Sequence, residues 1–107
     1  RKGIADIDAG RTTRVTLDDL DRLEIELSDQ AREDIAHWNR VDPARTAKIR
    51  RLLASVMETP YSGLGKPEPL KHSLSGYWSR RIDMEHRLVY RVEGETLHVV
   101  SCRYHYR

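Results

Sequence analysis

A single carboxylate lies between two prolines in the second half of this 107-residue chain, at Glu68 of Pro67-Glu68-Pro69. Proline fixes its own φ angle and disfavours helical backbone in the residue before it, so this stretch is predicted to be extended and to present Glu68 to solvent. Further side chains able to act on a phosphodiester follow along the chain: Lys71, Arg80, Arg81, Arg87, Arg103 and His105. A carboxylate can accept a proton, a histidine can donate one, and arginines can bind the charged phosphate oxygens.

RNA suits this set of groups because its 2′-hydroxyl is an internal nucleophile. Cleavage then needs a base, a clamp for the phosphate and an acid for the leaving 5′-oxygen, and we predict Glu68, Arg87 and His105 in these three roles. Arginine suits the clamp because its planar guanidinium can form two parallel bonds to a phosphate. Lys71 and Arg81 are expected to assist it. No metal and no other cofactor is needed.

Additional contacts with RNA are expected around this set. Tyr106, beside the predicted acid, could stack on a base or orient the scissile phosphate, and a base–aromatic stack contributes about 1–3 kcal/mol. Arg80 and Arg103 are expected to bind RNA together with Lys71 and Arg81.

Each assignment has a structural alternative. Glu68 could be a surface ion-pair partner of a neighbouring lysine, which contributes only about 0–1 kcal/mol. The remaining histidines of this region, His72, His86 and His98, are interpreted as surface or hydrogen-bonded residues. Cys102 and His105 lie three residues apart but have no second pair to complete a zinc site, and odd spacing puts them on opposite faces of a strand, so Cys102 is expected to be a buried free thiol.

Hydrophobic periodicity predicts the elements that position these residues. Leu23–Leu27 alternates apolar and acidic residues, which is typical of a strand. Ser28 is expected to cap a helix, and Asp42-Pro43 to begin a second helix that ends at Thr59-Pro60. The predicted buried stripes are Ala31, Ile35 and Trp38 in the first helix, and Ile49, Leu52, Leu53 and Val56 in the second. The basic residues Arg45, Lys48, Arg50 and Arg51 are expected to face away from the core.

The second half of the chain predicts strands. A short strand is expected over residues 68–71, and longer ones at Tyr77–Asp83, Arg87–Glu93 and Thr96–Tyr104. Within 87–93, alternate side chains separate an apolar face of Leu88, Tyr90 and Val92 from a cationic face of Arg87 and Arg91. The predicted fold is α+β: a strand, then two antiparallel helices packed on one face of a mainly antiparallel sheet.

Length and composition limit the number of domains and the class of partner. The length allows one domain, and the net charge is only +2, but residues 66–107 carry eight Lys or Arg against five Asp or Glu, with four of the five histidines. A basic half with tyrosines fits nucleic acid, although a solvated charged surface is an open alternative. One cysteine and the lack of a signal peptide or long apolar run predict a cytoplasmic protein.

Four motifs in this order resemble the RelE superfamily of bacterial toxins, and within it the YoeB type, over residues 23–106. They are Gly65-Lys66-Pro67-Glu68-Pro69-Leu70-Lys71-His72, Leu74-Ser75-Gly76-Tyr77-Trp78-Ser79-Arg80-Arg81-Ile82, Glu85-His86-Arg87-Leu88-Val89-Tyr90 and Cys102-Arg103-Tyr104-His105-Tyr106.

The resemblance implies a ribosome-dependent messenger-RNA endonuclease with a fold similar to the compact microbial ribonucleases, restrained by an antitoxin of the YefM or Phd type. It implies catalytic roles for Glu68, Arg87, His105 and Tyr106. The alternative is a toxin of the same fold that blocks the ribosome or gyrase by binding alone. The oligomeric state stays open, with a homodimer as one alternative.

The two chain ends are less defined by this pattern. Residues 22–107 are predicted to form the toxin domain, and residues 1–21 an arm that either resembles the C-terminal segment of some antitoxins or is an unrelated extension. Arg107 follows the tyrosine at which many such chains stop, which puts in doubt any role of a terminal carboxylate in positioning Tyr106.

Overall fold

The computed structural model describes residues 24–104, and residues 1–23 and 105–107 fall outside the described part. The predicted acid His105, its neighbour Tyr106, Arg107 and the arm at 1–21 therefore lie outside the described residues. Within 24–104, no helix is long and apolar enough to cross a membrane.

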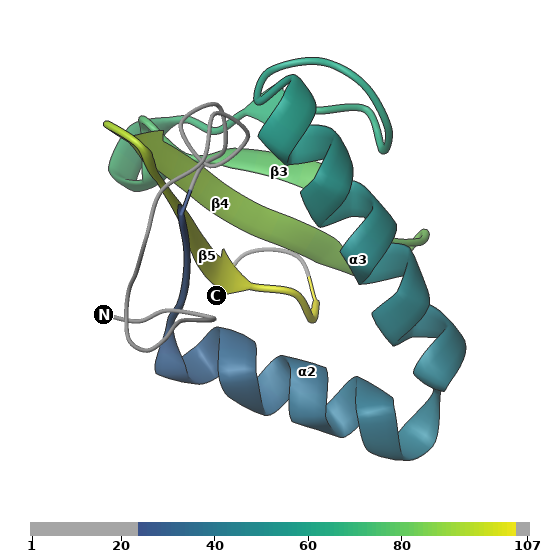
Figure 1. Cartoon of the computed structure of the whole chain (residues 1–107). Helices are drawn as coiled ribbons and strands as arrows, with labels where there is room; N and C mark the ends of the chain where they lie inside the picture. The colour runs from purple at the N-terminus through teal and green to yellow at the C-terminus, as the bar shows by residue number, and fades with distance from the viewer. Residues whose placement is uncertain (1–23, 105–107) are drawn as a thin grey trace, which may run out of the picture.

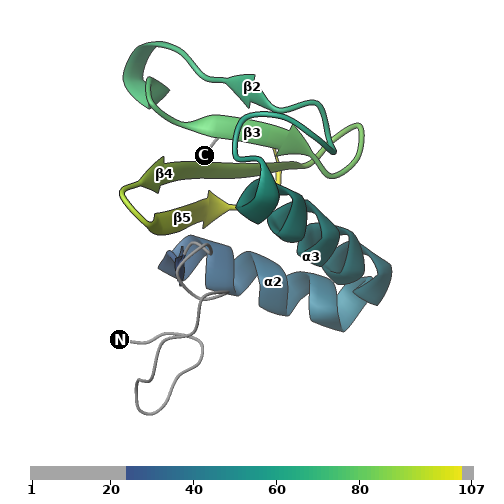
Figure 2. The same cartoon turned by 45° about the horizontal axis from the view of Figure 1, so that its top comes forward.

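Five strands form one sheet with both helices packed against the same face (Figures 1 and 2). The strands are β1 (Glu24–Leu27), β2 (Glu68–Pro69), β3 (Trp78–Arg81), β4 (Arg87–Glu93) and β5 (Thr96–Ser101), and their order in the sheet is β1-β5-β4-β3-β2. Among the strands of the described residues, only the β1–β5 pair is parallel. The predicted α+β architecture with a mainly antiparallel sheet is confirmed.

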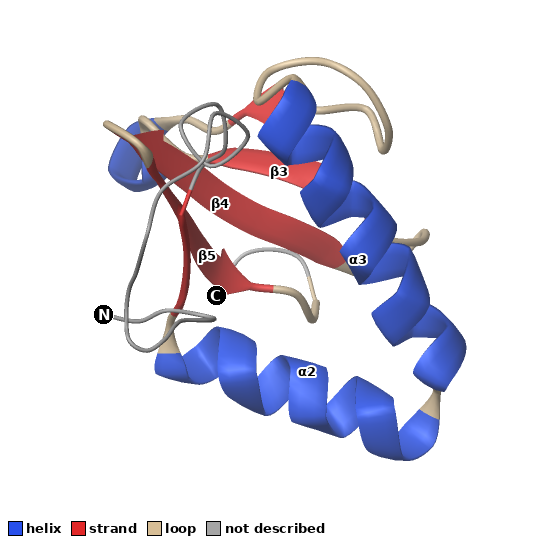
Figure 3. Ribbon diagram, in the orientation of Figure 1, coloured by secondary structure: helices blue, strands red, loops and turns tan. Residues whose placement is uncertain are grey.

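The two helices begin where the sequence predicts. Helix α2 (Asp29–Val41) is capped by Ser28, whose Oγ accepts a hydrogen bond from the Ala31 amide at 3.0 Å. Helix α3 (Pro43–Glu58) begins on its proline, but the Asp42 carboxylate forms no capping bond and instead lies 3.5 Å from Arg45 Nε. A short 3₁₀ helix, η1 (His72–Leu74), links β2 to β3 (Figure 3).

The core lies between the helices and the inner sheet face. It is formed by one cluster of buried side chains, with partly buried neighbours such as Ile35 and Leu53: Ala31, Trp38, Ile49, Leu52, Val56, Ile82, Leu88, Tyr90, Leu97, Val99 and Cys102. The predicted helix stripes and the buried free Cys102 are confirmed. Arg45 departs from its prediction, because its guanidinium covers the Trp38 ring at 4.8 Å and pairs with Asp83 instead of facing away.

The last strand ends at Ser101, three residues before its predicted end. At Cys102 the backbone turns away from β4 toward α2: its amide donates to the Asp34 carboxylate at 2.9 Å, and its carbonyl accepts from the Trp38 indole at 2.9 Å. Because both backbone groups are taken by helix side chains, they cannot continue the strand ladder.

Candidate active site

The predicted base and clamp meet on the sheet face that the helices leave open. Residues directly opposite each other in an antiparallel pair share a face, and the register places Glu68 opposite Ser79 and Arg81 opposite Arg87. The alternate pair, Arg80 opposite Leu88, points into the core. Glu68, Arg81 and Arg87 therefore lie on one face, although they come from three different strands.

Contact between Glu68 and Arg87 is direct. Glu68 Oε1 lies 3.5 Å from Arg87 Nη1, and the Glu68 side chain is 57% exposed while that of Arg87 is 12% exposed. Such a long, half-exposed pair contributes little to stability. Within residues 24–104, the Arg87 Nε donor is buried and makes no hydrogen bond, so the guanidinium keeps donor capacity beyond its carboxylate neighbour.

Small side chains of β3, β4 and β5, here called the floor of the site, lie next to these groups in the sheet. Ser79 and Val89 are buried and paired with each other across β3 and β4, and Ser101 follows in the next strand. The Oγ atoms of both serines are buried without a hydrogen-bond partner. Sequence reasoning did not single out this floor, although the alternation along residues 77–83 places Ser79 on the same face as Arg81.

The loop before Glu68 is fixed by the neighbouring arginine, Arg80. Its Nη1 donates to Ser55 Oγ and the Leu64 carbonyl, and its Nη2 to the Thr59 and Ser62 carbonyls. Its Nε donates to the phenol oxygen of Tyr90, and all five distances lie between 2.6 and 3.1 Å. Thr59 is the C-cap of α3, so the cation lies at the negative end of the helix dipole.

Arg80 is fully buried, and the expectation that it binds RNA is therefore wrong for this fold. All of its donor nitrogens are directed at the protein, because its place in β3 points it toward α3. Its role is to hold the loop of residues 59–65. That loop packs closely: Gly65 has a φ of 81°, and a Cβ there would lie 2.8 Å from Leu52 Cδ2.

Of the other predicted RNA contacts, Arg81 adjoins this pair, whereas Lys71 and Arg103 lie on other segments of the chain. Lys71 is exposed at the start of η1, on the connection that follows β2. Arg103 lies near α2, where its guanidinium covers the Tyr104 ring at 4.8 Å. The pKa of the nearby His37 lies below its usual value, through desolvation first and then through the charges of Arg103 and Arg40. Arg81 is exposed beside Arg87.

Two of the histidines without a predicted role are held by other residues. His98 lies 3.4 Å from Glu26 Oε1, and His86 is buried with its Nδ1 bonded to the Tyr104 amide at 2.7 Å. Sequence reasoning left the importance of His86 undetected, because its partners are brought together only by the fold. Its position directly before Arg87 was the one available signal.

Over residues 24–104, two helices packed on one face of a mainly antiparallel five-stranded sheet form the fold of the RelE-like toxins. A family model described as the YoeB-like toxin of the bacterial type II toxin–antitoxin system matches residues 27–106, and the chain belongs to this family. It is therefore a toxin of a type II toxin–antitoxin system.

Individual relatives agree with this family assignment. Toxin YoeB of Escherichia coli strain K12 is 49% identical over 79 residues, which cover 74% of this chain and 94% of the relative. A solved structure of a YoeB dimer from Staphylococcus aureus is 46% identical with a TM-score of 0.75, covering 79% of this chain and 99% of that one. A YoeB–YefM complex from the same species is 45% identical with a TM-score of 0.73, with the same coverage.

Proposed function

We propose that this toxin is a ribosome-dependent messenger-RNA endoribonuclease that works by metal-independent acid–base catalysis. The observation that carries the proposal is the meeting of Glu68 and Arg87 across the open sheet face, with Arg81 opposite Arg87. A carboxylate and a guanidinium this close together can act on one RNA linkage. The carboxylate accepts the proton of the 2′-hydroxyl, and the guanidinium binds the adjacent phosphate.

In the proposed reaction, Glu68 removes the proton of the RNA 2′-hydroxyl. The 2′-oxygen forms a bond to phosphorus while the bond from phosphorus to the 5′-oxygen breaks, and His105 donates a proton to that leaving oxygen. Arg87 binds the phosphate oxygens as negative charge builds on them, through nitrogens that include the unpaired Nε. Arg81 assists from the adjacent strand.

The remaining predicted contacts extend the same site. Lys71 binds RNA from the exposed connection after β2, and Tyr106 stacks on a base or orients the scissile phosphate. Arg103, which follows the end of β5, contacts RNA backbone. The ribosome holds the message in a reactive geometry that a protein with this small, open surface does not impose alone.

The structures of relatives support two protein partners. A relative from Staphylococcus aureus is described in complex with YefM, and another structure as a dimer. We propose that this toxin is likewise bound by an antitoxin of the YefM or Phd type, and that a second copy of the chain is a further partner. The toxin domain is taken as residues 22–107, with residues 1–21 as an arm, and the protein acts in the cytoplasm, where ribosomes are found.

Primer extension on a translated message tests the activity. With ribosomes and the full chain present, we expect new 5′ ends inside codons of the translated region, and no such ends when ribosomes are omitted. Stalled ribosomes on intact message would instead identify a toxin that blocks translation by binding alone, and would overturn the proposal.

A further inference from the structure

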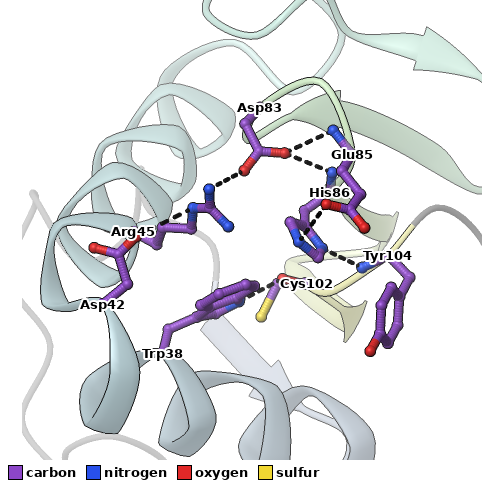
Figure 4. Close-up of polar contacts among 8 residues, drawn as sticks. All are labelled: Trp38, Asp42, Arg45, Asp83, Glu85, His86, Cys102 and Tyr104. Carbon is purple, nitrogen blue, oxygen red and sulfur yellow. Dashed lines mark hydrogen bonds and ion pairs between the residues drawn. The ribbon is translucent and has the colours of Figure 1, made fainter.

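The chain segment that leads into His105 and Tyr106 is held by two backbone hydrogen bonds of Tyr104. Its amide donates to His86 Nδ1 at 2.7 Å (Figure 4). Its carbonyl accepts from the Arg87 amide at 2.8 Å. Tyr104 has a φ of 62°, a left-handed conformation that L residues rarely adopt. His86, directly before β4, and Arg87, the first residue of β4 and the predicted phosphate clamp, thus hold the backbone of Tyr104, the residue before the predicted acid in sequence.

His86 is itself fixed on several sides. It is 6% exposed, its ring meets the edge of the Trp38 ring at a centroid distance of 4.8 Å, and its Nε2 lies 3.6 Å from Glu85 Oε1. Because Nδ1 accepts from the Tyr104 amide, that nitrogen must carry no proton, and in the neutral ring the proton is on Nε2, facing Glu85. One tautomer of the ring is therefore matched to both neighbours.

The turn that carries His86 is braced by Asp83. Its Oδ1 accepts from the amides of Glu85 and His86, each at 2.7 Å, and its Oδ2 lies 2.8 Å from Arg45 Nη2 of α3. Desolvation acts to raise the pKa of the Asp83 carboxyl, but these two amides and the Arg45 charge outweigh it and hold the pKa below its usual value. His86 is thus tied to both helices: its backbone to α3 through Asp83 and Arg45, and its ring to α2 through Trp38.

We infer that His86 is a positioning residue for the reaction, because its Nδ1 accepts from the amide of Tyr104 and so fixes the residue from which the chain continues into His105 and Tyr106. This inference rests on the proposed function, in which His105 is the general acid. His86 touches neither RNA nor a reacting atom in this scheme. Its effect on the reaction passes through one backbone hydrogen bond, and misplacing a catalytic group by about 1 Å can cost on the order of 10²-fold in rate.

Two conservative substitutions distinguish a role for the Nδ1 acceptor from a role for the packing of the ring. Asparagine places its amide oxygen close to where Nδ1 lies, so His86→Asn keeps an acceptor for the Tyr104 amide. Glutamine places its polar end where Nε2 lies, so His86→Gln keeps the Glu85 contact and loses the acceptor. In ribosome-dependent cleavage by the full chain, we expect His86→Gln to lower kcat by about 10- to 100-fold with KM unchanged, and His86→Asn to stay within a few-fold of the parent. Equal losses in both variants would overturn the inference and assign His86 to packing.

A variant without the two terminal side chains tests whether the effect passes through them. In a His105→Gln, Tyr106→Ala background, neither predicted functional side chain of the segment remains, so adding His86→Gln should cost no further rate. A full, multiplicative loss in that background would contradict the inference.

A measurement on the unsubstituted full chain keeps the inference testable even if His86→Gln fails to fold. The ¹⁵N spectrum of the imidazole should show an unprotonated Nδ1, and the Tyr104 amide should exchange slowly with solvent. A protonated Nδ1 in the neutral ring, or a rapidly exchanging Tyr104 amide, would overturn it. If both signals are as expected but the toxin cuts no RNA, the proposed function fails while the hydrogen bond that positions the segment stands; if RNA is cut and His86→Gln keeps its full kcat, the inference alone fails.

Discussion

Replacing Arg80 by methionine is expected to lower the free energy of unfolding by about 3 kcal/mol, because it removes a buried cation from a network of hydrogen bonds. Three of its acceptors are the loop carbonyls of Thr59, Ser62 and Leu64, and these lose their donor together. A lysine at the same position should recover only part of the loss, since its ammonium has three donors on one nitrogen and cannot span the same acceptors. Urea denaturation measures the effect.

The neighbouring arginine supplies a matched control. Arg81 differs from Arg80 by one position in β3 and is exposed on the opposite face. Arg81→Met should change the unfolding free energy by no more than about 0.5 kcal/mol. Similar stability losses for the two variants would mean that the Arg80 network does not hold the loop as described. The loop leads into Glu68, so Arg80→Met should also reduce cleavage.

Glu68→Gln is expected to lower the rate of ribosome-dependent RNA cleavage by about 10²- to 10⁴-fold, because the amide cannot accept the 2′-hydroxyl proton. The side chain is largely exposed and its contact with Arg87 is long, so the unfolding free energy should change by less than about 0.5 kcal/mol. Primer extension over a time course gives the rate, and urea denaturation gives the stability.

A second exposed glutamate tests whether loss of any surface carboxylate has this effect. Glu95 lies in the turn between β4 and β5, where its backbone carbonyl accepts a hydrogen bond from the Glu24 amide. Glu95→Gln should cleave RNA at the parent rate. Undiminished cleavage by Glu68→Gln would remove Glu68 as the base.

Local patterns predicted the elements of the fold, and nonlocal contacts decided where they end. Period-two alternation located β4, and the cap at Ser28 located the start of α2. The early end of β5 could not be predicted, because it depends on Asp34 and Trp38, more than sixty residues away in sequence, binding the backbone of Cys102.

The candidate site was predictable in residue type and only partly in geometry. Adjacent strand residues point to opposite faces, so Arg80 and Arg81 could not both face RNA, yet choosing between them needs the register of β3 against β4. Chemistry and the family resemblance suggested that Glu68 and Arg87 act together. Their distance could not be predicted, because it depends on how β2 pairs with β3 and β3 with β4. The role inferred for His86 depends on contacts with Trp38 and Tyr104 that no local pattern contains.

The chemistry of the cut ends tests the proposed catalytic site most directly. Attack by the 2′-hydroxyl must leave a 2′,3′-cyclic phosphate, or the 3′-phosphate formed when it opens, on the upstream fragment and a free 5′-hydroxyl on the downstream fragment. We therefore expect downstream fragments, made with ribosomes and the full chain, to accept radiolabelled phosphate from polynucleotide kinase without prior phosphatase treatment. Fragments with a 5′-phosphate and a 3′-hydroxyl would show that water, and not the 2′-oxygen, attacks phosphorus, and would contradict the roles assigned to Glu68, Arg87 and His105.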